Sequence, residues 1–110
     1  MSFKVSSVQE YFETLDKRFN AGAAAKVDAV YQFELGEDGT YHVEVHSGAC
    51  EVVEGAHDDP TTRIVMSGPN FVKMTNGELN GQMAYMSGKM KIKGSIPMAM
   101  KMKELFPQAG

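Results

Sequence analysis

The spacing of the apolar residues predicts a helix near the start of the chain. Over the first twenty residues they recur every three or four positions, which is the period of a helix with one buried face. Ser7 followed by Glu10 has the order of a capping box. We therefore predict a helix over residues 8–20 and a connection through the small residues that follow it.

Four strands are predicted in the middle of the chain. From Val27 onward apolar and polar residues alternate, as they do in a strand with one buried face. The segment GEDGT has the composition of a hairpin turn. We predict strands over residues 27–35, 41–46, 49–55 and 62–67, and we expect these four strands to form an antiparallel meander.

The last third of the chain predicts short helices and a fifth strand. Ser67 has the position of a helix cap, and a second short helix is expected over residues 80–86. The segment KMKIK alternates strictly, which predicts a strand over residues 89–93 with its lysines on a solvated face. Ser95 caps a final helix that is expected to end near Phe106.

These elements predict a single α+β domain that covers residues 1–110. A chain of 110 residues has the length of one domain with one core. Helices precede and follow the strands, so they must cover one face of the sheet. We expect a five-stranded, mostly antiparallel sheet with about four to five helices on that face.

Composition argues against several classes of protein. Cys50 is the single cysteine, so no intrachain disulfide can form, which fits a reducing compartment. No stretch approaches the roughly 18 apolar residues of a transmembrane helix. The first residues lack the apolar run of a signal peptide, and the chain does not end in a peroxisomal Ser-Lys-Leu signal. We therefore expect a cytoplasmic protein.

The charge is distributed unevenly along the chain. The formal net charge is −3, but residues 1–88 carry six Lys or Arg against thirteen Asp or Glu, whereas residues 89–110 carry five Lys against one Glu. A mostly acidic chain argues against general nucleic-acid binding. Its basic end suits an anionic surface or an anionic ligand.

The predicted final helix has more apolar surface than one packing contact needs. On a helical wheel its apolar residues span about 220°, against roughly 100° for a helix packed on one side. One explanation is burial on two sides of a small core, for which methionine is a common filler. The other is that part of this surface lines a cavity for an apolar guest of variable shape. Composition leaves both explanations open.

No residue pattern indicates a catalytic or metal site. His42 and His46 are four residues apart on one strand face, which separates them by about 13 Å, too far to share a metal ion. We expect these histidines and His57 to be solvated. The chain has no glycine-rich phosphate loop, no zinc-protease motif, no paired cysteine ligands and no nucleophilic triad. We therefore predict that the protein is not an enzyme and needs no metal or cofactor.

The last forty residues resemble the sterol carrier protein 2 (SCP2) family. The family pattern contains a short helix that ends in a methionine-plus-glycine turn, a helix with Gln-x-Ala, the segment Gly-Lys-Met-Lys-Ile-x-Gly and an Ala-Met-Lys helix. These motifs fall at Phe71, Met74, Gly77, Gln82, Ala84, Tyr85, Met86, Gly88–Gly94 and Ala99–Lys101. Upstream, the segment YQFEL is similar to the family's usual first strand.

The resemblance implies an SCP2-like fold with a hydrophobic tunnel between the helices and the sheet. It implies binding and transfer of fatty acids, acyl-CoA, sterols or phospholipids, with no chemistry performed. A tunnel there would be lined from both layers, and the apolar residues expected to line it are Phe33, Val43, Val45, Phe71, Met74, Met83, Met86, Ile92, Met98, Met102, Leu105 and Phe106. Gln82 is the candidate for a hydrogen bond to the lipid's polar group. Lys101 and Lys103 flank the expected opening and are candidates for docking to headgroups or to a membrane.

Two other functions stay open at this point. The chain could be a protein-interaction module that docks through its apolar C-terminal helix, or a small hydrolase or isomerase that acts on lipids. The expected partners are a lipid ligand and, transiently, an anionic membrane surface, with no nucleic acid. We expect a monomer.

Overall fold

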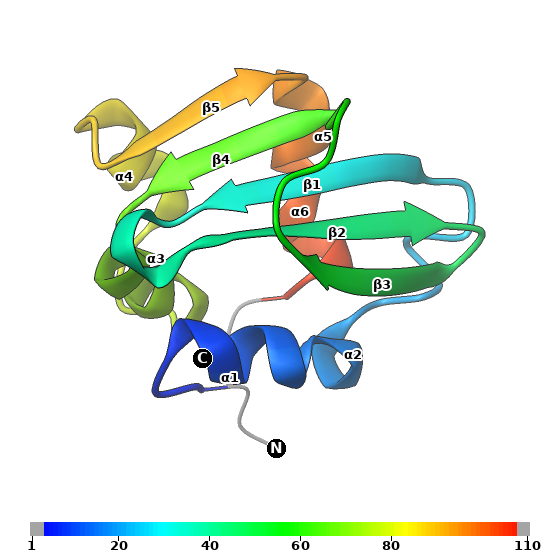
Figure 1. Ribbon diagram of the computed structural model, residues 1–110, viewed down its shortest axis with the longest axis horizontal. Coiled ribbons are helices and arrows are strands. Elements are labelled where there is room, and N and C mark those ends of the chain that lie inside the picture. The colour runs from blue at the N-terminus through cyan, green and yellow to red at the C-terminus, as the bar shows by residue number, and fades with distance from the viewer. Residues whose placement is uncertain (1–3, 108–110) are drawn as a thin grey trace.

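The computed structural model of the chain describes residues 4–107, which form a five-stranded sheet covered by helices on one face (Figure 1). The strands lie in the order β3-β2-β1-β4-β5, with the bounds β1 Asp28–Glu34, β2 Thr40–His46, β3 Ala49–Glu54, β4 Thr62–Met66 and β5 Met90–Gly94. The helices are α1 Val8–Glu13, α2 Leu15–Arg18, the 3-10 turn η1 Gly36–Asp38, α3 Gly68–Thr75, α4 Gly81–Met86, α5 Ile96–Met100 and α6 Met102–Leu105. The α+β class and the mostly antiparallel sheet are confirmed. The C-terminal tripeptide, in which the sequence predicts no peroxisomal signal, lies outside the described residues.

Four helices begin at a side-chain cap, three of them where the sequence predicts one. The side chains of Ser7, Ser67, Asn80 and Ser95 each accept a hydrogen bond from the backbone N–H three residues further on. Each cap satisfies a backbone donor that has no partner inside its helix, which is worth about 1 kcal/mol.

The two longer predicted helices are each interrupted. Thr14 separates α1 from α2, and its hydroxyl donates to the carbonyl oxygen of Glu10 at 2.7 Å. Such a bond from a threonine to its own helix often bends the helix. Lys101 likewise lies between α5 and α6. The described residues therefore form six short α-helices in place of four to five.

The predicted antiparallel meander is wrong at its last step. β1 pairs antiparallel with β2, and β2 with β3, but β4 pairs parallel with β1. The chain crosses back over the sheet to reach the free edge of β1. There Arg63 of β4 donates two hydrogen bonds to the Glu34 carboxylate, from Nε at 2.5 Å and from Nη2 at 2.9 Å. β5 then pairs antiparallel with β4.

The segment that makes this crossing, residues 55–61, is held on the open face of the sheet by polar side chains. His42 Nδ1 lies 2.8 Å from the Gly55 carbonyl oxygen, and the His57 N–H donates to Gln32 Oε1 at 2.8 Å. His42 and Gln32 are each only 5% exposed. The prediction that His42 is solvated is therefore wrong, because the crossing segment covers it.

Aromatic rings fill the interior over β1 and β2. Phe12 of α1 stacks on Tyr41 at 4.3 Å between ring centroids and on Phe71 of α3 at 5.9 Å. It also meets Phe33 in an edge contact at 5.4 Å. Each such pair contributes about 0.5–1.5 kcal/mol beyond the burial of its area. We call these four residues the aromatic cluster, and they leave this half of the interior solidly packed.

Gly94, at the end of β5, occupies a position that only glycine fits. Its φ is +88°, and a Cβ there would lie 2.7 Å from the carbonyl oxygen of Thr61. We predict that Gly94→Ala lowers the free energy of unfolding by about 2–5 kcal/mol, because left-handed strain and a backbone clash add. Urea denaturation measures the loss.

Gly88→Ala is the matched control, because Gly88 has a φ of +83° but open space around it. It should cost only the left-handed strain, about 1–2 kcal/mol. Equal losses at the two positions would contradict the clash.

Candidate functional site

A cavity of about 360 Å³ lies between the β4–β5 half of the sheet and the helices. Sites for small organic ligands typically have volumes of about 300–1,000 Å³ and mostly apolar walls. Two strands and each of the described α-helices contribute to the wall, which consists of Tyr11, Arg18, Ile64, Phe71, Met74, Thr75, Gly81, Gln82, Tyr85, Met90, Ile92, Ile96, Ala99, Met100, Met102, Lys103 and Phe106.

The space exists because the two halves of the interior are filled differently. The aromatic cluster fills the β1–β2 half. Over β4 and β5, the helices α4 and α5 present Gly81 and Ala99 to the cavity, and these residues have little side chain to fill it. Met74, Met90 and Met102 form much of the remaining wall. Methionine is flexible and polarizable, so this wall can adapt to the shape of a guest.

Two hydrogen bonds fix the last helices over the cavity. The hydroxyl of Tyr31, on β1, donates to the Met98 carbonyl oxygen at 2.9 Å. The Asn20 N–H donates to the Leu105 carbonyl oxygen at 2.9 Å. Burial raises the pKa of Tyr31 to about 12, so its phenol remains a donor at neutral pH. The roof of the cavity is therefore tied to the sheet and to the connection after α2.

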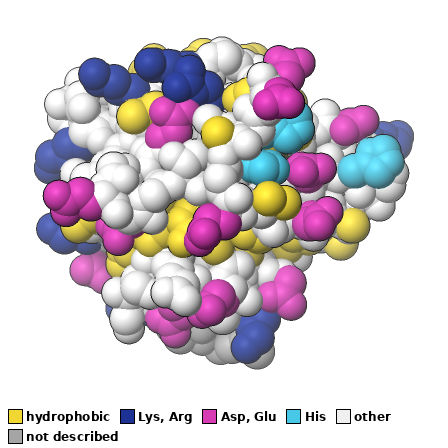
Figure 2. All heavy atoms as spheres, viewed as in Figure 1, with side chains coloured by type: hydrophobic (Ala, Val, Ile, Leu, Met, Phe, Trp, Pro, Cys, Tyr) yellow, Lys and Arg dark blue, Asp and Glu magenta, His cyan; other side chains and the backbone are white. Residues whose placement is uncertain are grey.

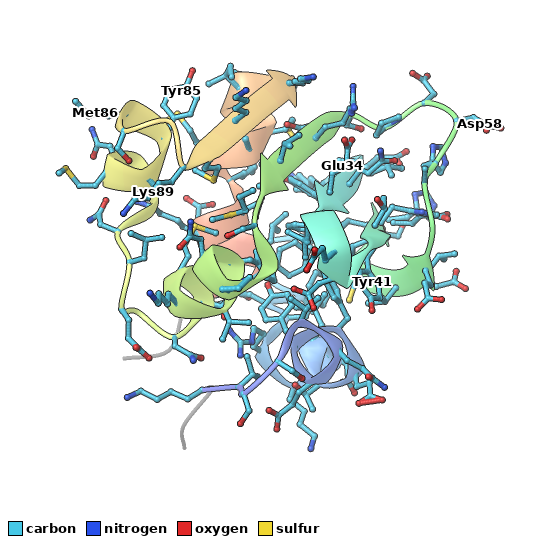
Figure 3. The ribbon with its side chains drawn as sticks, turned by 60° about the vertical axis from the view of Figure 1, so that its left-hand side comes forward. Glu34, Tyr41, Asp58, Tyr85, Met86 and Lys89 are labelled. Carbon is cyan, nitrogen blue, oxygen red and sulfur yellow. The ribbon has the colours of Figure 1, made fainter. Side chains whose placement is uncertain are left out.

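The cavity opens to the surface between α4, α5 and α6. Five of its wall residues are exposed, and we call them the mouth: Gln82, Tyr85, Ile96, Met100 and Lys103. Among them, Tyr85 is 46% exposed and Met100 is 70% exposed. Figure 3 shows Tyr85 projecting outward from α4, on the outer side of the molecule. The mouth is thus largely apolar, with one lysine at its edge.

Three polar residues of the cavity wall are buried, and we call them the inner end: Tyr11, Arg18 and Thr75. Each of them is at most 4% exposed. The guanidinium carbon of Arg18 lies 4.7 Å from the centroid of the Tyr11 ring, and its Nη1 donates to the Pro107 carbonyl oxygen at 3.3 Å. Burial raises the pKa of the Tyr11 phenol well above its usual range, against an opposing effect of Arg18. Burial also lowers the pKa of Arg18.

The cavity brings together about half of the residues that the sequence predicts at a ligand site. These are Phe71, Met74, Gln82, Ile92, Met102 and Phe106. Lys103, predicted to dock headgroups, also lies in the wall, and Lys101 is exposed between α5 and α6. Contact of any of these side chains with a ligand stays a prediction.

The other predicted site residues lie away from the cavity wall, and they are Phe33, Val43, Val45, Met83, Met86, Met98 and Leu105. The strand residues and Leu105 belong to the solid core. Met83 and Met86 are 62% and 72% exposed, because α4 turns Ala84 inward in their place. Figure 3 shows Met86 on the outer side of α4. Their predicted position inside the tunnel is therefore wrong.

The sequence analysis missed the inner end. Tyr11 and Arg18 are seven residues apart, so they face the same side of the first helical stretch. The sequence does carry a signal for this pair. Arg18 occupies a position of the helix that should face the interior, and an arginine is rarely buried there unless it is paired or serves a site. The predicted helical pattern rests on Val8, Phe12, Leu15 and Phe19 and does not include Tyr11 or Arg18.

The electrostatic surface agrees with the charge pattern of the sequence. Figure 2 shows Lys and Arg side chains gathered at the edge where β5 lies, and acidic side chains over much of the rest of that face. Lys89, Lys91 and Lys93 are all exposed, as predicted. Among the described residues, no group of three or more His, Cys, Asp or Glu is placed to hold a metal ion. The part of the chain that the structure describes also contains no helix of the length and apolarity that a membrane span needs.

Comparisons with known proteins assign this architecture to a family. The model of the SCP-2 sterol transfer family matches residues 10–107. Hydroxysteroid dehydrogenase-like protein 2 of Mus musculus is 39% identical over 105 residues, which cover 93% of this chain and 21% of that protein. Sterol carrier protein 2 of Homo sapiens is 29% identical over 77% of this chain and 16% of its own length. The chain thus spans about a quarter or less of the curated relatives described here.

A solved structure supports the fold independently. The solution structure of palmitated SCP2L2 from Aedes aegypti superimposes with a TM-score of 0.69 at 21% identity, covering 94% of this chain and 97% of that one. The SCP2-like fold predicted from the sequence is confirmed.

We predict that the free energy of unfolding falls as the pH rises above about 10, where an unfolded tyrosine ionises. The folded state keeps Tyr11 and Tyr31 protonated at that pH, because burial raises both pKa values. The stability that they contribute is present below pH 10 and is lost as the pH rises through the folded-state values. Urea denaturation between pH 8 and pH 11 measures the decline. Tyr11→Phe should make it shallower, and an unchanged slope would argue against a buried phenol.

Proposed function

This chain belongs to the SCP-2 sterol transfer family, and we propose that it binds one hydrophobic lipid in the cavity and transfers it between membranes without altering it. The observation that carries the proposal is an apolar cavity of about 360 Å³ that is roofed by fixed helices and opens at an apolar mouth. The volume is at the small end of the range for organic ligands. It therefore favours a lipid with a single chain, such as a fatty acid, over a phospholipid with two chains.

The energetics suit a carrier. Burying about a dozen methylenes gains roughly 10 kcal/mol at about 0.8 kcal/mol each. Association costs on the order of 4–15 kcal/mol, so the net affinity is modest. A carrier must release its ligand as well as hold it, and modest affinity permits both.

Transfer requires contact between the mouth and a membrane. The exposed side chains of Ile96 and Met100 offer apolar surface there, and Lys101 and Lys103 lie on the same segment. Each basic residue near an anionic bilayer contributes about 1 kcal/mol of attraction. We assign these two lysines to membrane docking.

The alternative function, protein interaction through the C-terminal helix, has less support. Ala99, Leu105 and Phe106 are buried against the rest of the domain, which leaves Ile96 and Met100 as the exposed apolar residues of that helix pair. Native mass spectrometry distinguishes the two functions, because a carrier should appear as a monomer with co-purified lipid. The dehydrogenase-like name belongs to proteins of which this chain matches about a fifth to a quarter, and we propose no such activity for this chain.

We predict that the protein binds a fluorescent stearic acid analogue, and that Ala99→Leu weakens this binding roughly ten- to hundredfold. Ala99 lines the cavity, and the added carbons occupy the space of about two or three ligand methylenes at about 0.8 kcal/mol each. Fluorescence titration measures the dissociation constant. Ala25→Leu adds the same bulk at an exposed position outside the cavity and should leave the affinity unchanged. If the parent protein fails to bind the analogue, the proposed function is wrong.

We predict that reversing both charges, Lys101→Glu with Lys103→Glu, slows transfer of the same analogue from anionic vesicles. The attraction of two lysines is lost and repulsion replaces it, so a rate reduction of about tenfold or more is expected. High salt should slow the parent protein as well. Lys17→Glu with Lys26→Glu changes the net charge equally at exposed positions outside the mouth and serves as the control. Equal rates for the two double variants would remove the docking role.

A further inference from the structure

Three methionines are strongly exposed at the surface, and we call them the rim methionines: Met83, Met86 and Met100. They are 62%, 72% and 70% exposed. The other large apolar side chains exposed in the described part of the chain are Tyr85 and Ile96. All five lie on α4 and α5, two of the helices between which the cavity opens. Exposed apolar surface of this kind therefore gathers around the mouth.

The local structure keeps the rim methionines out of the core. The short helix α4 buries Ala84 alone among its residues, and Met83 and Met86 are three residues apart, so they are neighbours on its outer surface (Figure 3). On α5, Ala99 is buried, whereas the next residue, Met100, is exposed at the mouth. The three thioethers are therefore open to water.

The other methionines of residues 4–107 are shielded to different degrees. Met66, Met74 and Met90 are 5%, 6% and 8% exposed, and Met98 and Met102 are half-buried. Met74, Met90 and Met102 line the cavity, where a bound lipid would shield them further. The chain thus carries one set of thioethers that meets a dissolved reagent directly and another set that the fold protects.

A thioether differs from other apolar side chains in that a peroxide oxidises it reversibly. The sulfur lone pair attacks one oxygen of hydrogen peroxide, the O–O bond breaks, and an S–O bond forms. The leaving hydroxide takes the proton of the new S–OH group and becomes water, so sulfur loses two electrons and the peroxide gains them. The product, methionine sulfoxide, is polar, and reductases convert it back to methionine. Oxidation therefore changes an apolar group at the mouth into a polar one.

We propose that the rim methionines are a reversible oxidation site, through which a peroxide switches off the docking of the mouth to an anionic membrane. This inference rests on the proposed lipid transfer and adds a mode of regulation to it. The charge of the segment favours a membrane as the partner of the rim, because residues 81–105, from α4 to α6, carry five lysines and one glutamate. A sulfoxide must lose water to enter the bilayer surface, and that cost weakens docking.

Oxidation at the rim should affect docking much more than lipid binding. Met83 and Met86 lie outside the cavity wall, and Met100 lies at its exposed edge. The affinity for a lipid should therefore change little while the rate of transfer to a membrane falls. This difference between affinity and rate distinguishes a loss of docking from damage to the cavity.

The experiment treats the protein, loaded with the fluorescent stearic acid analogue, with hydrogen peroxide. Peptide mass spectrometry should find sulfoxide at the rim methionines before it appears at Met74 or Met90. Transfer of the analogue to vesicles of phosphatidylcholine and phosphatidylserine should then be about tenfold slower, because two or three sulfoxides oppose the contact with the bilayer. The dissociation constant of the analogue should change by less than about twofold. Methionine sulfoxide reductases A and B together should restore the rate.

The matched control is the triple variant Met83→Leu, Met86→Leu and Met100→Leu. Leucine has a similar apolar volume but no sulfur to oxidise. The rate of each protein after peroxide is divided by its own rate before treatment, and this ratio should fall for the parent and stay near one for the leucine variant. The corresponding triple glutamine variant is polar without oxidation and should be slower than the leucine variant from the start. Circular dichroism and the urea midpoint establish that each variant is folded.

The outcomes separate this inference from the proposed function. An oxidised rim with an unchanged transfer rate would overturn the inference and leave lipid transfer intact. An equal loss in the parent and the leucine variant would place the damage elsewhere, and oxidation of Met74 or Met90 before the rim would remove the selectivity, so each of these results also overturns it. Failure of the untreated parent to bind or transfer the analogue would overturn the proposed function together with the inference.

Discussion

The contact of Phe12 with Tyr41, Phe33 and Phe71 divides the interior in two, and the rest of the site depends on that division. The rings of this aromatic cluster span the distance from α1 across α3 to β1 and β2, and they hold those elements at a spacing set by their width. The neighbouring half, over β4 and β5, is covered by α4 and α5, which present small residues to it. Because the cluster fixes the separation of the layers, the small residues cannot close onto the sheet, and a cavity remains.

The final helix shows why an apolar pattern alone does not locate such a cavity. The residues of its wide apolar arc lie in three different environments in the structure. Leu105 is buried in the interior, Ala99, Met102 and Phe106 line the cavity, and Met100 is exposed at the mouth. Burial in the core and lining of a cavity, the two positions that the sequence left open, therefore both occur for different residues of one arc. The choice depends on what lies opposite each side chain, which is a tertiary property.

Most of the helices and strands could be predicted because they depend on local chemistry. The pairing of strands that are distant along the chain could not be predicted. Helix caps such as Ser67 and Ser95, and the alternating pattern of β5, involve only a few neighbouring residues. They can therefore be recognised directly from the sequence. The parallel placement of β4 beside β1 depends on Gln32 and His42, which hold the crossing segment from 13 and 25 residues away along the chain. In an alternating pattern these two side chains are indistinguishable from solvated ones. The inner end was missed for a related reason, since Arg18 departs from the apolar pattern that was used to assign the helix.

If the chain carries a lipid as proposed, the apolar mouth determines where that lipid can leave. Ile96 and Met100 are exposed at the mouth, and Lys101 and Lys103 lie on the same segment. With the mouth resting on a bilayer, a hydrocarbon chain would pass from one apolar environment to another without crossing water, so the free energy of its burial would be retained during the transfer. In solution the same chain would have to enter water before it could leave, which opposes release. A cavity with an apolar mouth would therefore retain its ligand in water and release it at a membrane, which are the two properties that a carrier needs.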